Sequence, residues 1–465
     1  MKSLSLSFSI AAVLALSGCS MLQPRSTEVA PAIPSQWPAT ASTAPAVEVD
    51  AIGWRDYFVD ARLQTVIDQA LDNNRDLRVA VLNVEKARAQ YRIQRADRVP
   101  GIAAQGQMTR TGGDAPVAEQ FSANLGVAEF ELDLFGRVRN LSEAALQQYF
   151  AEAANRRSAQ LSLVAEVANA WLTLGADREQ LRIAQDTLAA HQDSLRLTEA
   201  RHQLGGASAL ELSQTRTLVE TARTDVARYQ GQVAQDRNAL TLLAGGPVDD
   251  SALPDGAVLE VAAVRAIPAG VPGEVLLRRP DVMSAEHLLL SANANIGAAR
   301  AAFFPSIRLT GSIGSASDEL SGLFDSGTRV WSFMPQISIP IFQGGKLRAG
   351  LGVANANRDI ALAQYEKAIQ SGFREAADAL ALNDSLDAQL ESQQALVAAA
   401  EQAQTLSQAR YDAGLDSFLT LLDARRTAYS ARQSLVSTQL AQQSNQVALY
   451  KVLGGGWHER GVASR

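Results

Sequence analysis

The chain repeats itself at an offset of 209 residues. Residues 201–223 and 410–432 align with eight identities in 23, and both segments read as a helix that breaks and starts again. A repeat of this kind indicates that the chain is built from two copies of one structural plan. The repeat constrains the fold more than any other feature, because each element found in one half is expected in the other.

Each half contains a long segment with a helical pattern and no proline. One runs from Arg137 to His202, 66 residues that would form about 100 Å of helix, and its counterpart runs from Gly345 to Tyr411. Leucine or valine recurs every seven residues at positions 174, 181, 188 and 195 and, beyond the break, at 219, 226, 233 and 240. A sustained repeat of seven predicts helices packed side by side. The second half keeps this repeat less cleanly.

Stretches of alternating apolar and polar residues precede each long helix. In the first half a helix over residues 60–98 is expected to end before Pro100, since proline removes a donor and disfavours helix before it. Alternation follows at residues 102–109 and 121–134 in the first half, and at 306–313 and 331–341 in the second. The sequence therefore predicts one hairpin of about ten-residue strands in each half, with one apolar face, as transmembrane β-strands have.

The apolar phase changes near residues 127–130, which predicts a bulge or a bend there. Because of this change, two placements of Glu129, Glu131 and Asp133 are open. They line the lumen of a barrel and make its wall acidic, or they lie on the outer surface of a helical extension.

The breaks in the repeat predict the turns of two helical hairpins. Gly205 and Gly414 supply the positive φ that closes a helix, and Ser208 and Ser417 are placed to cap the helices that restart. Each chain would thus carry two helical tips, about 100 Å of helix away from the strands.

Composition excludes several function classes. The chain of 465 residues carries a net charge of −7, one Cys and four His, which rules out a disulfide framework and argues against a His/Cys metal site. Mild acidity argues against nucleic acid as a partner. The sequence holds no Gly-rich phosphate loop, no GxSxG and no spaced set of acid, base and nucleophile. We therefore expect no enzyme, no metal and no cofactor.

The N-terminus has the pattern of an export signal. Lys2 precedes an apolar run at residues 4–16 that is too short to span a bilayer. The Leu-Ser-Gly-Cys that follows resembles the lipobox of bacterial lipoproteins, so cleavage would leave Cys19 as a lipidated first residue. The alternative is a plain signal peptide with an incidental cysteine. By the same resemblance, Ser20 in place of Asp favours the outer membrane.

Four strands leave two open edges, which a membrane does not tolerate. Two copies of the chain would give eight strands, a barrel filled by its own side chains, whereas three copies would give 12 strands and room for a passage. The predicted fold class is an α+β membrane protein: a trimeric 12-strand β-barrel with four strands per protomer, continued by a long periplasmic α-helical barrel and built from two repeats.

The sequence resembles the TolC-like outer-membrane factor family, in its lipidated OprM/NodT-type branch. The resemblance covers the mature chain and is carried by the paired tips and by residues 276–314, 132–139 and 339–349. It implies the exit duct of a tripartite efflux pump, which passes drugs or other small molecules and performs no reaction. The implied partners are a periplasmic adaptor and an inner-membrane transporter of RND type, and the implied location is the outer membrane.

The resemblance also implies roles for individual residues. The gate that closes the periplasmic end would be formed by Leu419 and Asp423, four residues apart on one helix face; alternatively, Asp423 is a solvated helix residue. The counterpart of Asp423 in the first tip is Gln214, so the repeat is asymmetric here. Adaptor docking would use Arg201, Gly205, Ser208, Arg410, Gly414 and Ser417. Plain turn chemistry is the alternative for the glycines and serines.

The expected organisation begins with a signal peptide at 1–18 and a lipidated tether at 19–50. A first repeat follows at 51–250, with a β-hairpin at 100–135 and a helical tip near 205. A linker and equatorial region at 251–279 leads to a second repeat at 280–456, with a β-hairpin at 305–342 and a helical tip near 414, and a tail at 457–465.

Three other functions are open: a duct for metal cations, a type I protein-secretion duct, and a structural coiled-coil lipoprotein without a pore. The strand pairs argue against the last.

Overall fold

The computed structural model describes Pro34 and residues 52–114, 116–256 and 273–455. The predicted signal peptide, the Cys19 lipidation site and nearly all of the tether lie outside these ranges. The chain forms two compact units. The first contains the described residues of 82–154 and 283–368, and the second those of 32–81, 155–282 and 369–465.

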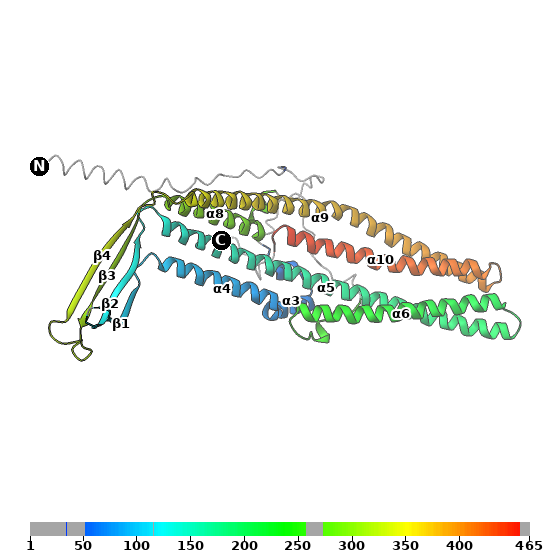
Figure 1. The fold of residues 1–465 in the computed structure, drawn as a ribbon. Helices are drawn as coiled ribbons and strands as arrows, with labels where there is room; N and C mark the ends of the chain where they lie inside the picture. The colour runs from blue at the N-terminus through cyan, green and yellow to red at the C-terminus, as the bar shows by residue number, and fades with distance from the viewer. Residues whose placement is uncertain (1–33, 35–51, 115, 257–272, 456–465) are drawn as a thin grey trace. The chain divides into compact units, whose positions relative to one another are not determined.

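The first unit contains a four-stranded antiparallel sheet. Its strands lie side by side in chain order (Figure 1): β1 (Ile102–Thr111), β2 (Ala118–Leu132), β3 (Ser306–Ser317) and β4 (Arg329–Ser338). The two hairpins predicted from alternation are confirmed, and pairing of β2 with β3 joins them. Among the described residues, β1 pairs only with β2 and β4 only with β3, so each leaves one edge free.

One face of this sheet is mostly apolar. Residues paired across antiparallel strands share a face, and the register brings the apolar residues of all four strands into common rows. Two such rows are Ile102–Val127–Gly311–Phe333 and Ala104–Leu125–Ile313–Trp331. Trp331 is 76% exposed and Phe333 65%. Large apolar side chains therefore cover a surface that the described chain does not bury.

The predicted bulge in β2 is confirmed, and it keeps the apolar face intact. Between Val127 and Phe130, β2 advances three residues while β3 advances two. Glu129 occupies the bulge with φ +51, a conformation that side chains with a Cβ seldom adopt. Its N–H donates to the hydroxyl of Thr310 at 3.3 Å. The extra residue returns Phe130 to the face of its partner Leu309, which explains the change of phase.

Helices complete the first unit, each with part of its length: α4 (Arg75–Ala96), α5 (Arg137–Gln203), α8 (Pro280–Ala301) and α9 (Lys346–Asp412). The contact of α5 with α8 is close, because a Cβ on Gly297 would lie 2.6 Å from the buried Asn140 side chain. The hydroxyl of Ser291 donates to the Ala144 carbonyl at 2.9 Å. In the described ranges, no helix is both long enough and apolar enough to cross a membrane.

The second unit holds the main hydrophobic core. It adds the remaining elements: α2 (Trp54–Tyr57), α3 (Ala61–Asn73), α6 (Ala209–Leu243), η3 (Asp250–Ala252), η4 (Gly273–Arg278) and α10 (Phe418–Val452). The rings of Tyr57 and Tyr450 stack with centroids 3.9 Å apart. Burial raises the pKa of both phenols, and the Tyr57 hydroxyl donates to the Gln446 carbonyl at 2.8 Å. The core thus joins the start of the described chain to its last helix.

The prediction of one helix over residues 60–98 is wrong, because Asn74 separates α3 from α4. The Asn74 side chain accepts from the Leu77 N–H at 2.9 Å and donates to the Leu243 carbonyl at 3.0 Å. The second of these bonds joins segments far apart in the sequence. The break is therefore fixed by a tertiary contact.

Gly245 is expected to be among the least replaceable glycines of the second unit. It has φ +71, and a Cβ there would lie 2.4 Å from the Asn73 carbonyl oxygen. Gly414 is a matched control, because it has φ +72 but an added Cβ would meet no described atom within 4 Å. We expect Gly414→Ala to cost about 1–2 kcal/mol from backbone strain. Gly245→Ala should cost about 1–3 kcal/mol more from overlap.

Thermal unfolding followed by circular dichroism checks this ordering in the purified full-length protein. Equal melting temperatures for the two variants would contradict the close approach of Gly245 to α3.

Candidate functional site

The two helical hairpins, α5/α6 and α9/α10, end in turns of the same chemistry (Figure 1). Gly205 has φ +79 and Gly414 has φ +72. The Ser208 hydroxyl accepts from the Glu211 N–H at 3.1 Å, and the Ser417 hydroxyl accepts from the Thr420 N–H at 3.4 Å. The predicted closing and capping of these helices is confirmed.

Tyr411 brings the two tips of one chain together. Its hydroxyl accepts from Arg201 at 2.9 Å and donates to the carboxylate of Glu211 on α6. The Arg201 guanidinium also lies 5.5 Å from the centroid of the tyrosine ring. Burial and the neighbouring Glu211 raise the pKa of Tyr411, so the hydroxyl keeps the proton that this bond requires. Arg201 therefore ties the first tip to the second.

Arg410 does not join this cluster. It forms two hydrogen bonds with Asp416 of its own tip, at 2.7 and 2.9 Å. These bonds and the charge of the guanidinium hold the pKa of Asp416 below its usual value. The counterpart residues Arg201 and Arg410 thus serve different contacts, the first between tips and the second within one.

Leu419 and Asp423 share one exposed face of α10, as their spacing predicts. Leu419 is 63% exposed, and Asp423, one turn further along, is exposed as well. Leu421 between them is buried, with 1% of its surface exposed. The helix therefore packs through Leu421 and presents a leucine and a carboxylate outward.

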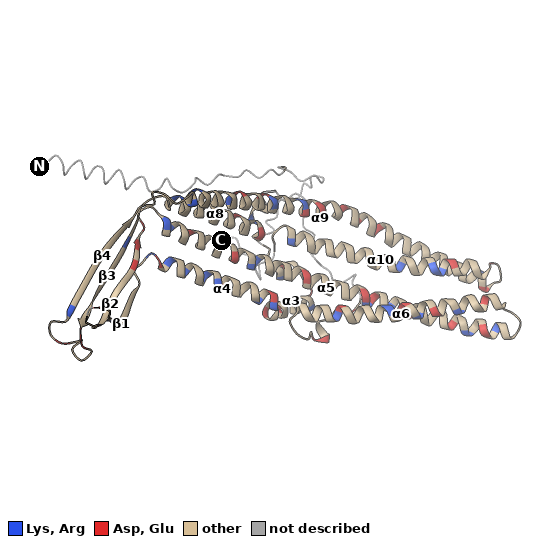
Figure 2. Ribbon diagram, viewed as in Figure 1, with Lys and Arg blue, Asp and Glu red and all other residues tan. Residues whose placement is uncertain are grey.

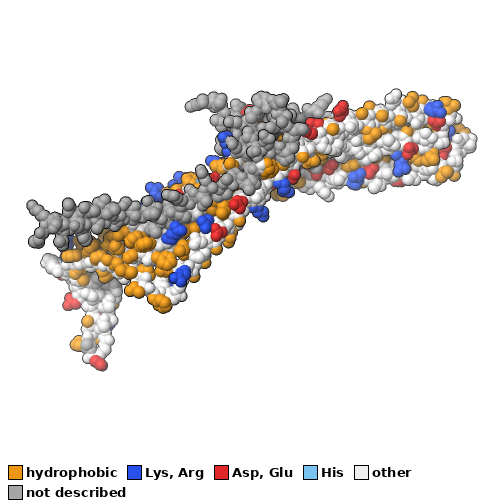
Figure 3. All heavy atoms as spheres, turned by 90° about the horizontal axis from the view of Figure 1, so that it is seen from above, with side chains coloured by type: hydrophobic (Ala, Val, Ile, Leu, Met, Phe, Trp, Pro, Cys, Tyr) orange, Lys and Arg blue, Asp and Glu red, His pale blue; other side chains and the backbone are white. Residues whose placement is uncertain are grey.

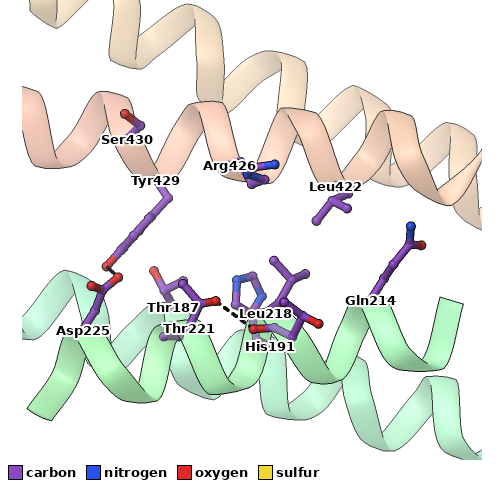
Figure 4. A pocket seen from close by; sticks show the side chains of 12 residues that line it. Thr187, His191, Gln214, Leu218, Thr221, Asp225, Leu422, Arg426, Tyr429 and Ser430 are labelled. Atoms are coloured by element: carbon purple, nitrogen blue, oxygen red, sulfur yellow. Dashed lines mark hydrogen bonds between the residues drawn. The ribbon is translucent and has the colours of Figure 1, made fainter. Parts of the chain in front are cut away.

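A cavity of about 470 Å³ lies in the second unit between α5, α6 and α10. Figure 4 shows Tyr429 reaching from α10 to Asp225 on α6, where its hydroxyl donates to the carboxylate at 2.9 Å. Burial and the bond to Asp225 raise the pKa of Tyr429. Gln214 and His191 also line this cavity. Gln214, the counterpart of the exposed Asp423, is thus half-buried and lines this cavity.

The sequence did not predict the roles of Tyr411 and Tyr429, which link the two helical hairpins. One signal was available: Tyr411 follows the tip arginine where the first repeat has His202. The partners Glu211 and Asp225 could not have been found, because each lies about 200 residues away in the sequence.

Helix α8 begins at Pro280, directly after Arg279, and Asp281 lies in its first turn. Sequence reasoning did not find that Arg279 is buried, with 8% of its surface exposed. Its guanidinium contacts Asp281 at 2.8 Å, Glu375 at 3.0 Å and the Val452 carbonyl at 2.8 Å. One cation thus joins three segments of the second unit.

Few charged residues lie on the strands (Figure 2), and the acids near the end of β2 have partners. Glu131 pairs with Arg137 at 2.6 Å. Glu129 pairs with Arg308 at 3.4 Å. The carboxylate of Asp133 accepts the Arg139 N–H at 2.7 Å in the first turn of α5. The contacts of Glu131 and Asp133 tie the end of the sheet to α5, whereas that of Glu129 joins β2 to β3.

A sheet with an exposed apolar face, followed in each repeat by a 67-residue helix and a capped tip, defines the protomer of a membrane channel. The model of the outer membrane efflux protein family matches residues 66–246 and 271–455, one match for each repeat. The chain belongs to this family.

Named relatives and solved structures support the same family assignment. The chain is 46% identical to the toluene efflux pump outer membrane protein TtgC of Pseudomonas putida over 96% of this chain and 94% of that protein. It is 43% identical to outer membrane protein OprJ of Pseudomonas aeruginosa over 96% and 95%. The open-state structure of the Neisseria gonorrhoeae outer membrane channel MtrE superposes with a TM-score of 0.89 and 41% identity, covering 95% of this chain and 99% of that one. The predicted α+β channel fold, outer-membrane location and efflux role are confirmed.

Proposed function

We propose that three copies of this chain form the exit duct of an efflux pump in the outer membrane. The observation that carries the proposal is the sheet, with its apolar face and its free edges on β1 and β4. A free edge is not tolerated in a bilayer, because its backbone groups find no water there. Further copies of the chain must supply the missing neighbours of β1 and β4.

Barrel size favours three copies. Eight strands from two copies would enclose only side chains, whereas 12 strands would leave a passage. Exposed apolar side chains on the helices also suit packing between copies, for example Leu82 at 50%, Val353 at 61% and Ile360 at 55% exposed. Figure 3 shows hydrophobic side chains at the surface alongside charged ones. Neighbouring copies would cover part of this apolar surface.

The cargo that we propose is small organic molecules, including drugs. The relatives carry names that refer to pumping of toluene, solvents and antibiotics, and they align with nearly the whole of this chain. A duct for metal cations and a type I protein-secretion duct share the architecture, but no feature of the described residues favours them. As a passage, the duct would perform no reaction.

We propose that Cys19 carries the lipid anchor and that the tips engage the rest of the pump. The partners would be a periplasmic adaptor and an inner-membrane transporter of RND type. Docking would use Arg201, Gly205, Ser208, Arg410, Gly414 and Ser417, of which Arg410 is well exposed. The intact mass of the mature chain tests lipidation: a mass without added acyl groups at Cys19 would rule it out.

We propose further that Leu419 and Asp423 form the gate of the duct. Their exposure on one face of α10 supports this, because in a three-fold assembly such a face could meet its copies at the axis. Three carboxylates close together would repel one another and attract cations.

Single-channel recording in planar bilayers tests the duct, with two glycines of the sheet as a matched pair. A Cβ on Gly314 would lie 2.1 Å from the Ala123 carbonyl oxygen, whereas one on Gly311, in the same strand, would come no nearer than 3.5 Å to its neighbours. We expect trimeric mass and discrete conductance for wild type and Gly311→Ala, and loss of both for Gly314→Ala. A wild-type protein that is monomeric and does not conduct would instead support a structural lipoprotein without a pore.

A further inference from the structure

The seam between α5 and α6 contains two aspartates that face each other. The seven-residue repeat of α5 places Asp177 three residues after Leu174, and that of α6 places Asp236 four residues before Leu240. Both leucines are fully buried, and the carboxyl groups of the two aspartates are close enough to hydrogen-bond. This contact is consistent with an antiparallel register in which the layer beside Leu174 and Leu240 is made of two acids.

The same register accounts for the other layers of the seam. Continued along both helices, this register would place Leu181 near Val233, Ala184 near Tyr229, Leu188 near Val226, His191 near Ala222, Leu195 near Val219 and Thr198 near Thr215, and it agrees with the ion pair of Glu199 with Arg216 at 3.2 Å. Each of these residues is buried or half-buried. Two acids in a layer of a coiled coil are costly when both are charged, because like charges at short range repel and each has lost part of its water.

One carboxylate oxygen of the acidic layer lacks a donor among the described residues. Oxygen Oδ2 of Asp236 is shielded from solvent and has no hydrogen-bond partner among the described residues, and Oε1 of Gln232, one turn away, is in the same position. Two ionised carboxylates cannot satisfy each other, because both only accept. A single added proton would supply the missing donor between Asp177 and Asp236.

The arginines next to the two aspartates in sequence do not replace that proton. The nearest arginines in sequence are engaged elsewhere: Arg178 donates to the Pro254 carbonyl at 2.5 Å, and Arg237 pairs with Asp250 of η3. Helix α10 reaches this stretch of α5 through the bond from Gln180 to the Gln433 carbonyl at 2.9 Å. From residue 433 to residue 450, α10 carries no charged side chain.

The second repeat provides an internal comparison. At the offset of 209, Asp177 corresponds to Leu386 and Asp236 to Asn445. Both are buried, and the Asn445 side chain donates to the Ala379 carbonyl at 3.0 Å. The equivalent layer of α9/α10 is therefore neutral and supplied with a donor. The acidic layer is a property of the first hairpin alone.

We propose that Asp236 carries a proton and donates it to the Asp177 carboxylate across the α5/α6 seam, and that this layer makes the first helical hairpin sensitive to pH. The pair holds the helices together when it carries the proton, and it pushes them apart when both groups are ionised.

The direction of the effect follows from the pKa values. Burial and the bond to Asp177 raise the pKa of Asp236 to about 6. The stability that the proton provides is present below the ordinary pKa of aspartate, and it is lost as pH rises through about 6. His191 in the same seam acts in the opposite sense, since burial and the nearby Arg425 lower its pKa to about 4. An experiment must therefore separate the titration of the carboxyl pair from that of His191.

Infrared titration of the full-length protein makes that comparison directly. We expect a protonated carboxyl band in wild type that disappears with a midpoint near pH 6 and is absent in Asp236→Asn. Asp186→Asn is the control, because Asp186 is an exposed acid of α5 paired with Arg182 at 2.9 Å, and it should leave the band unchanged. A wild-type spectrum with no carboxyl group titrating near that pH, or a band that persists in Asp236→Asn, would overturn the proposal.

A second variant keeps the proposal testable if Asp236→Asn folds poorly. Asp177→Leu combined with Asp236→Asn transplants the neutral layer of the second repeat into the first. We expect this double variant to melt at a higher temperature than wild type at pH 7.5, and the difference to shrink when the pH is lowered to 5. An equal difference at both pH values would show that the layer is not a proton switch.

Discussion

Replacing Arg279 with methionine is expected to lower the free energy of unfolding by about 2–4 kcal/mol. Removing one partner of a buried ion pair costs about 3–5 kcal/mol, because the other charge is left uncompensated. Here Asp281 and Glu375 are about 40% exposed, so water would recover part of that cost. The Val452 carbonyl would also lose its hydrogen bond. Chemical denaturation followed by circular dichroism measures the change.

Lysine at position 279 is expected to restore only part of the stability that Arg279 provides, because of the groups around the side chain. Gly372 leaves room for the side chain, since a Cβ there would lie 3.3 Å from the guanidinium carbon. The guanidinium makes two bonds to the Asp281 carboxylate and one to Glu375, a forked arrangement that a single ammonium group does not reproduce. We therefore expect Arg279→Lys to fall between wild type and Arg279→Met.

An exposed arginine of α5 is the control for this prediction. Arg182 pairs with Glu179 at 2.6 Å and with Asp186 at 2.9 Å, but 60% of its side chain is exposed. Surface pairs of this kind contribute about 0–1 kcal/mol. If Arg182→Met and Arg279→Met destabilise the protein equally, the three contacts of Arg279 do not hold the second unit together.

The strands and tips could be predicted from the sequence because their signals are local. Alternation in residues 121–134 is a property of neighbouring positions, and the phase change at the bulge was visible because Glu129 and Glu131 interrupt the apolar row. The tips could be predicted for the same reason. Gly205 and Gly414 followed by Ser208 and Ser417 meet the backbone requirements of a helical turn without any distant partner.

The contacts that join the hairpins could not be predicted, because they depend on pairing across about 200 residues. In the sequence, Tyr411 has no feature that identifies its partner, but in the structure it is half-buried and its hydroxyl bonds to Glu211 of α6. The sequence around Asn74 predicts one long helix, whereas in the structure the Asn74 side chain bonds to the Leu243 carbonyl at the break between two helices. The burial of Arg279 depends likewise on Glu375 and Val452. In each case a polar side chain in a helix acquires its role from another segment.

Replacing Asp423 with alanine is expected to raise the single-channel conductance several-fold, on the proposal that it forms the gate. Three carboxylates near an axis would bind cations and water strongly, and they would narrow the passage together with the exposed Leu419. Alanine removes both the charge and the bulk. Because the carboxylate is exposed in the single chain, the change should leave the melting temperature nearly unaltered.

The internal repeat supplies a matched control for the gate. Gln214 stands at the position of Asp423 in the first repeat, yet it lines the cavity between α5, α6 and α10. Gln214→Ala is therefore expected to leave the conductance unchanged. Equal conductance of wild type, Asp423→Ala and Leu419→Ala would place the gate elsewhere. An increase in Gln214→Ala alone would mean that the first hairpin, and not the second, controls the passage.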